Sequence, residues 1–115
     1  MQPIPGTGRA LRPVVVAERL DELHGPVAGR HRLPLRLDAS ARPLYDFADP
    51  HDRDLAYRIV LAEACSFADL TDWLDEGALL AMWQDLYLPK HIRTAWERQH
   101  PQLSQLGAGP HAPSA

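Results

Sequence analysis

Proline limits the length of every regular segment that this chain can form. The sequence has 11 prolines among 115 residues, and several of them cluster near the two ends. Because proline has no backbone N–H, it is disfavoured inside helices and in central sheet strands. We therefore expect one small, α-rich domain over residues 13–103, between flexible tails at residues 1–12 and 104–115.

The composition excludes several classes of protein. The apolar fraction is 45% and the charged fraction is 23%, as in ordinary globular chains. No apolar run is long enough to span a membrane, so we expect no membrane partner. The single cysteine, Cys65, cannot form an internal disulfide, which favours a cytoplasmic location. A domain of this size has little room for a cofactor-binding sheet, so we expect no cofactor.

The N-terminal third is predicted to hold a helix and then a β hairpin. Pro13 suits a first helical turn and Gly25 suits a helix end, which predicts a helix over residues 14–24. Its apolar stripe is Val16, Leu20 and Leu23, although three consecutive valines would equally suit a strand. The residues that alternate with other types in the next segment are Leu33, Leu35 and Leu37. Their period of two predicts a half-buried edge strand, which would pair with residues 44–47 in a hairpin over about 31–47.

Helix signals become stronger after residue 48. Asp49-Pro50 is a capping residue followed by a proline at the first helical position, and Ser66 is a second plausible cap. The predicted helices are 50–64, 67–75, 78–86 and 89–99, with a break at Gly77. In the third of these, the core stripe is Leu79, Met82, Trp83 and Leu86. The expected fold class is therefore mainly α, a small domain of three to four helices with a short N-terminal hairpin.

No motif in the sequence specifies a reaction. The six histidines form no HExxH motif and no i, i+4 pair on a firmly predicted helix, so we expect no metal site. No nucleophile elbow and no phosphate-binding loop is present. Cys65 follows an apolar helix, where a small buried thiol is the usual occupant. We therefore expect neither an enzyme nor a small-molecule substrate.

Two surface features favour a role in binding another protein. Helix 50–64 is apolar around nearly its whole circumference, which indicates a central helix or one that also contacts a partner. Residues 49–88 carry nine acids and two arginines, which would suit a basic partner or form a solvated face. Trp73 is either a core residue or an interface anchor. The predicted docking residues are Tyr57, Leu61, Asp69, Asp72, Trp73, Asp75 and Glu76.

The alternative is a DNA-binding regulator that uses helix 89–99. With helix 78–86 before it, this segment has the spacing of a helix-turn-helix. The candidate phosphate contacts are Lys90, Arg93 and Arg98, which would otherwise form a charged helix exterior. Three cations supply few phosphate contacts, so useful affinity would require a dimer.

The stretch Leu88–Trp96 has the pattern LPxxxRxxW, and the preceding segments follow in a familiar order. Over residues 14–103 the chain resembles a group of small uncharacterised proteins of GC-rich bacteria, encoded beside nucleotidyltransferase-fold toxins of the abortive-infection type. The resemblance implies a role as an antitoxin or accessory partner of such a toxin, and it transfers no catalytic residue. The chain departs from that group at Glu63-Ala64-Cys65, where a glycine-containing turn is expected.

Overall fold

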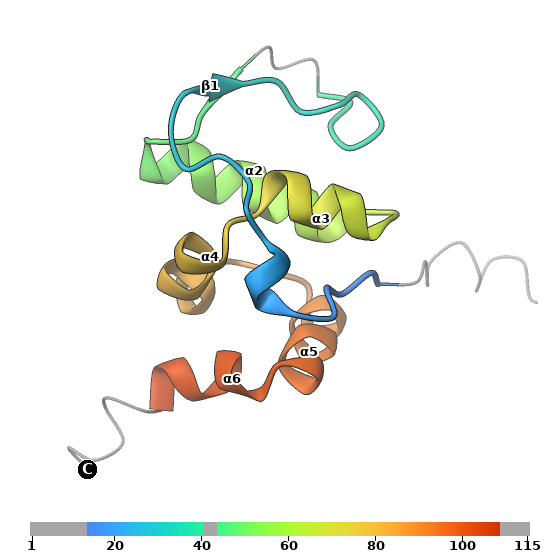
Figure 1. Ribbon diagram of the computed structural model, residues 1–115, viewed down its shortest axis with the longest axis vertical. Helices are drawn as coiled ribbons and strands as arrows, with labels where there is room; N and C mark the ends of the chain where they lie inside the picture. The colour runs from blue at the N-terminus through green and yellow to red at the C-terminus, as the bar shows by residue number, and fades with distance from the viewer. Residues whose placement is uncertain (1–13, 41–43, 109–115) are drawn as a thin grey trace, which may run out of the picture.

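A computed structural model describes residues 14–40 and 44–108 (Figure 1). The predicted tail at residues 1–12 and the end of the predicted tail at 104–115 lie outside the described residues. The elements are η1 (Leu20–Glu22), β1 (Arg30–His31), β2 (Tyr45–Asp46), α2 (Pro50–Glu63), α3 (Phe67–Trp73), α4 (Glu76–Met82), η2 (Trp83–Asp85), α5 (Lys90–Gln99) and α6 (Pro101–Ala108), where η marks a 3-10 turn. The fold is mainly helical with a short antiparallel hairpin near the N-terminus, as predicted.

The elements form two groups at opposite ends of the molecule, and α4 lies between them. The hairpin, α2 and α3 form one end, and α5 and α6 form the other (Figure 1). The segment before β1 crosses the molecule from the α5 end to the hairpin, so it joins both ends. The largest fully buried side chains are Trp83, Trp96, Tyr57 and Phe47, which confirms Trp83 and Trp96 as core residues.

The predicted helix over residues 14–24 is wrong. The segment is extended apart from the single turn η1, which begins without a side-chain cap. The three valines at its start have a stiff χ1 torsion that favours extended backbone. Its backbone bonds to distant elements instead: Gly25 N donates to Leu74 O at 2.7 Å, and His24 forms an isolated antiparallel bridge with Asp75.

Gly25 is required for a close approach between chain segments rather than for a helix end. A Cβ atom at this position would lie 2.7 Å from Leu74 N and from Trp73 O, and closer still to the carbonyl carbon of Trp73. The extended segment therefore rests directly on the backbone that links α3 to α4. At the other end of the segment, the ring Nε2 of the buried His100 bonds to Ala17 O at 2.6 Å.

The predicted strand over Leu33–Leu37 is also wrong, although the hairpin lies where it was expected. The backbone N–H groups of Leu37 and Asp38 both donate to Pro34 O, at 2.9 and 3.0 Å, which makes this segment a tight turn. Leu33 and Leu37 are buried, whereas Leu35 is 71% exposed. Because Pro34 fixes its own φ and cannot donate to a ladder, the turn is favoured over a strand.

Side-chain caps explain the boundaries of the next three helices. The Asp49 side chain accepts from Asp52 N at 2.9 Å, and Ser66 Oγ accepts from Asp69 N at 3.3 Å, so both predicted caps are confirmed. Asp75 Oδ2 accepts from Ala78 N at 3.0 Å and begins α4 earlier than predicted. Gly77 therefore lies inside α4 and is not a helix breaker.

The C-terminal end of the helical domain also differs from the prediction, which placed it at residue 103. Pro101 does end α5, but it also occupies the first position of α6, where its missing N–H has no consequence. The part of the predicted tail over residues 104–108 is therefore helical.

Candidate protein-docking site

Two of the predicted docking residues belong to the core. Tyr57 is 0% exposed and Leu61 is 2% exposed, so the prediction that they form a docking surface is wrong. They lie on the face of α2 that packs inward with Ala56 and Val60. The Tyr57 hydroxyl oxygen accepts from Asp75 N at 2.9 Å, and burial raises the pKa of this phenol.

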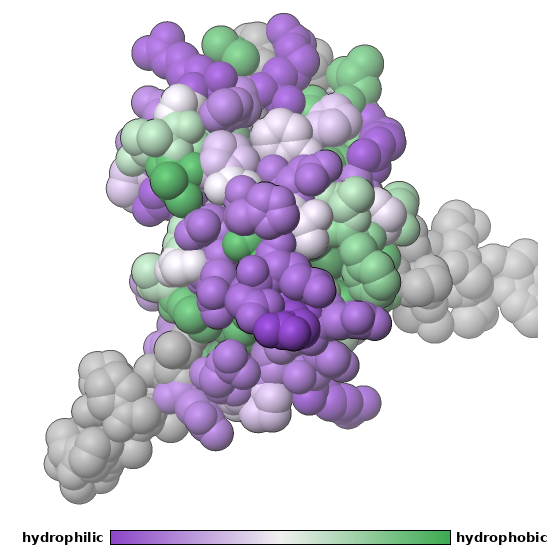
Figure 2. Space-filling model, viewed as in Figure 1, coloured by the Kyte–Doolittle hydropathy of each residue, from purple (hydrophilic) through white to green (hydrophobic). Residues whose placement is uncertain are grey.

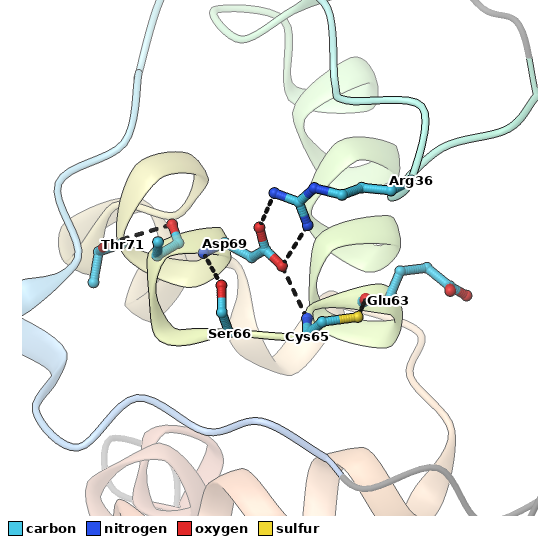
Figure 3. Close-up of polar contacts among 7 residues, drawn as sticks. Arg36, Glu63, Cys65, Ser66, Asp69 and Thr71 are labelled. Carbon is cyan, nitrogen blue, oxygen red and sulfur yellow. Dashed lines mark hydrogen bonds and ion pairs between the residues drawn. The ribbon is translucent and has the colours of Figure 1, made fainter.

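Asp69 is a third predicted docking residue that is buried, with 1% of its surface exposed. Figure 3 shows its carboxylate between the guanidinium of Arg36 and the backbone N–H of Cys65. Arg36 Nη1 donates to Oδ2 at 2.8 Å, Nη2 donates to Oδ1, and Cys65 N donates to Oδ2 at 2.9 Å. The hydrogen bond from Arg36 lowers the pKa of Asp69 against the opposing effect of burial. Asp69 therefore joins the Pro34–Asp38 turn to the start of α3.

The other predicted docking residues keep some exposure. Asp72 is exposed, while Trp73, Asp75 and Glu76 are half-buried. The ring of Trp73 lies 6.0 Å from that of Phe47, and Asp75 caps α4. A role for these four residues in docking stays a prediction. The expected burial of Cys65 is wrong, because its side chain is exposed and its thiol donates to Glu63 O at 3.4 Å (Figure 3).

A partly open apolar surface lies on the other face of α2. Leu55, Ile59 and Ala62 form a second stripe at i, i+4 and i+7, and all three are only half-buried. The Pro34–Asp38 turn faces this stripe and contributes Leu35 and Leu37. Together they line a groove of about 540 Å³, which we call the α2 groove.

Charged side chains from both walls border the α2 groove. Arg36 is 59% exposed on the turn side, and Arg58 is 33% exposed on α2. The Arg58 Nε lies 3.1 Å from an Asp54 carboxylate oxygen. A guanidinium has five N–H donors, and the bonds from Arg36 to Asp69 use two of them. Each wall thus presents a cation that is already oriented by a carboxylate, and each also contributes an acid, Asp38 on the turn side and Glu63 on α2.

Arg93, one of the three residues in the DNA-binding alternative, is held inside the fold. Its guanidinium carbon lies 4.9 Å from the centre of the Trp83 ring. Its Nη2 donates to the carbonyl oxygens of Trp83, at 3.2 Å, and of Leu86. Arg93 therefore fixes the connection between α4 and α5 and is not available as a phosphate contact. Lys90 and Arg98 are exposed, as that alternative requires.

Within residues 14–40 and 44–108, no group of three or more His, Cys, Asp or Glu side chains is placed to hold a metal ion. None of the helices in the same ranges combines the length and the apolar character needed to cross a membrane. 

No protein-family model matches the chain, and neither a curated protein nor a solved structure matches it. The resemblance to toxin-associated proteins therefore stays a prediction, and the interpretation of function depends on the surfaces described above.

Proposed function

We propose that this protein is a non-catalytic protein-binding module and that the α2 groove is its docking site. One observation supports the proposal above the others: α2 has a second apolar stripe that its own fold leaves half open, beside a leucine that is 71% exposed. Full burial of one leucine side chain is worth about 1.5–3 kcal/mol, so covering Leu35 and the stripe would contribute substantially to affinity.

The dimensions and lining of the groove favour a partner helix. Leu55 and Ala62 are seven residues apart, which corresponds to about 10 Å along α2 and to two turns of a helix laid against it. A polyproline ligand would require an aromatic lining, and the residues that line the groove include no aromatic side chain. Strand addition would require a sheet edge, but the two-residue strands β1 and β2 do not line the groove.

Charge narrows the chemistry of that partner helix. Arg36 and Arg58 stand on opposite walls of the groove, and Asp38 and Glu63 also line it. Carboxylates on the two flanks of an apolar stripe are therefore favoured where they lie opposite the two arginines. We therefore expect the partner to present an amphipathic helix with Asp or Glu beside its apolar residues. The resemblance noted above makes a nucleotidyltransferase-fold toxin the first partner to test, with this protein as its antitoxin or accessory subunit.

The test is co-purification with the product of the neighbouring gene, using variants on and off the groove. Leu35→Asp and Ile59→Asp place a charge in the apolar lining and should reduce capture at least tenfold. Val27→Asp is the matched control, because Val27 is 51% exposed and does not line the groove. It should bind as the wild type does.

Equal capture by all variants would refute the docking site. Failure of the wild-type protein to co-purify, together with no relief of the partner's toxicity, would refute the toxin as partner. Circular dichroism of each variant establishes that a loss of capture does not reflect unfolding.

A further inference from the structure

The outer face of α5 carries a continuous polar stripe that the docking proposal does not use. Its members are Lys90, His91, Thr94, Ala95 and Arg98, which border a shallow hollow of about 600 Å³. All are exposed except Ala95, which is half-buried. Figure 2 shows that the face over α5 and α6 is mainly hydrophilic. We call this set the α5 stripe.

The α5 stripe contains two cations and no acid. The acid of α5, Glu97, lies seven residues after Lys90 and borders the stripe on one side. Its carboxylate is engaged elsewhere, because it accepts from Trp83 Nε1 at 3.0 Å and lies 3.6 Å from Arg93. The sequence of α6, Pro101–Ala108, has no charged residue. Within α5 and α6, the positive charges of Lys90 and Arg98 are therefore opposed only by a carboxylate that Arg93 already pairs, although residues 49–88 are strongly acidic.

The helix that carries the stripe is firmly positioned. Arg93 bonds to two carbonyl groups in the connection from α4, and Trp96 packs against Trp83 with ring centres 6.2 Å apart. A recognition helix must be held in this way, because its side chains can read a ligand only from a fixed orientation.

We infer that the α5 stripe binds double-helical DNA, with Lys90 and Arg98 on phosphates and His91 and Thr94 towards the base edges. Lys90 and Arg98 are eight residues apart, or about 12 Å along the helix, which corresponds to about three to four phosphates along one DNA strand. Histidine and threonine side chains between the cations can donate and accept hydrogen bonds at base edges.

Two other polyanions fit the stripe less well. The major groove of double-stranded RNA is too narrow to admit a helix. An anionic membrane surface calls for bulky apolar side chains that insert among the lipids, and Ala95 is the apolar member of the stripe. The stripe lies at the end of the molecule opposite the Pro34–Asp38 turn, so DNA and a docked protein would not compete for one surface (Figure 1).

The test is fluorescence anisotropy of the full chain with a labelled duplex of roughly 20 base pairs, titrated at several salt concentrations from about 20 mM upwards. Because two phosphate contacts per copy supply little affinity, we expect two copies to bind one duplex, so that log K falls against log salt with a slope of about −2 per copy and about −4 for the pair. Lys90→Ala and Arg98→Ala should each weaken binding about five- to tenfold at low salt and reduce the slope by about one per copy. Arg32→Ala, an exposed arginine near β1, is the matched control and should change neither quantity.

The inference is overturned if the wild-type chain shows no binding at the lowest salt concentration. It is also overturned if Arg32→Ala weakens binding as much as Lys90→Ala, since any exposed cation would then suffice. Equal or tighter binding to double-stranded RNA, or to vesicles with anionic phosphatidylglycerol, would assign the stripe to a different ligand. Melting temperatures of the two stripe variants should match the wild type, because both side chains are exposed.

Discussion

Replacement of Gly25 by alanine tests how the extended N-terminal segment is held. The new Cβ would lie 2.7 Å from Leu74 N and Trp73 O, and closer still to the carbonyl carbon of Trp73. Non-bonded carbon atoms prefer about 3.5 Å, so one backbone must move by roughly 1 Å. Overpacking of this kind costs about 1–3 kcal/mol, and the displaced Gly25–Leu74 hydrogen bond adds about 1 kcal/mol. Gly25→Ala should therefore destabilise the fold by about 2–4 kcal/mol.

Gly77→Ala is the matched control, and its expected change in stability has the opposite sign. A Cβ there would meet Asp75 Oδ2 at 3.4 Å, an ordinary contact, and Gly77 lies in the first turn of α4. Alanine has the higher helix propensity, so Gly77→Ala should stabilise the fold by up to about 1 kcal/mol. In urea, with an m value of about 1.5 kcal/mol/M, Gly25→Ala should lower the unfolding midpoint by about 1–3 M. An unchanged midpoint for Gly25→Ala would refute the close approach.

The remaining predictions concern two arginine contacts. The lowered pKa of Asp69 means that its carboxylate stabilises the fold fully above about pH 4, its ordinary value, and that this contribution is lost as the pH falls through the lowered pKa. Asp69→Asn should thus lower the free energy of unfolding at pH 7 by about 1–2 kcal/mol, and this variant should lose less stability than the wild type below pH 4. Urea unfolding at several pH values measures both effects. An equal decrease of the free energy of unfolding with pH in variant and wild type would contradict this role of Asp69. Arg93→Ala leaves the carbonyls of Trp83 and Leu86 without this donor, so calorimetry should show a melting temperature lower by several degrees, for a loss of about 1–3 kcal/mol. If Arg93→Ala leaves the melting temperature unchanged, the conclusion that Arg93 fixes the connection between α4 and α5 is wrong.

Local signals in the sequence predicted the helical half of the molecule well. Asp49-Pro50 and Ser66 act through bonds to residues three positions away, so their effect is contained in the sequence itself. Asp75 caps α4 through a bond to a residue three positions away, so the same kind of signal predicts a helix that begins at residue 76 and contains Gly77.

Long-range contacts determined what local signals missed. The segment after Val14 is extended because its backbone bonds to the α3–α4 link and to His100, which is 83 residues from Ala17. Asp69 similarly faces Arg36 across 33 residues, and the spacing of acids along α3 gives no indication of that pairing. Such pairings depend on the tertiary fold and cannot be read from one sequence.

Helix 50–64 was predicted to be apolar nearly all round, and the two docking residues predicted on it lie on its buried side. Tyr57 and Leu61 are larger than Ala62 and looked like interface anchors, yet large side chains also fill a core best. Periodicity identifies two stripes, and only the position of α3 and of the Pro34–Asp38 turn decides which stripe stays open.

The central claim is that a partner helix occupies the α2 groove. The most direct measurement is a methyl NMR spectrum of the protein labelled at Ile and Leu, before and after addition of the neighbouring gene's product. We predict that the methyl signals of Leu35, Leu55 and Ile59 shift together, while that of Leu79, which is fully buried, does not. Signals in the groove that stay unchanged while the partner is bound would contradict the claim.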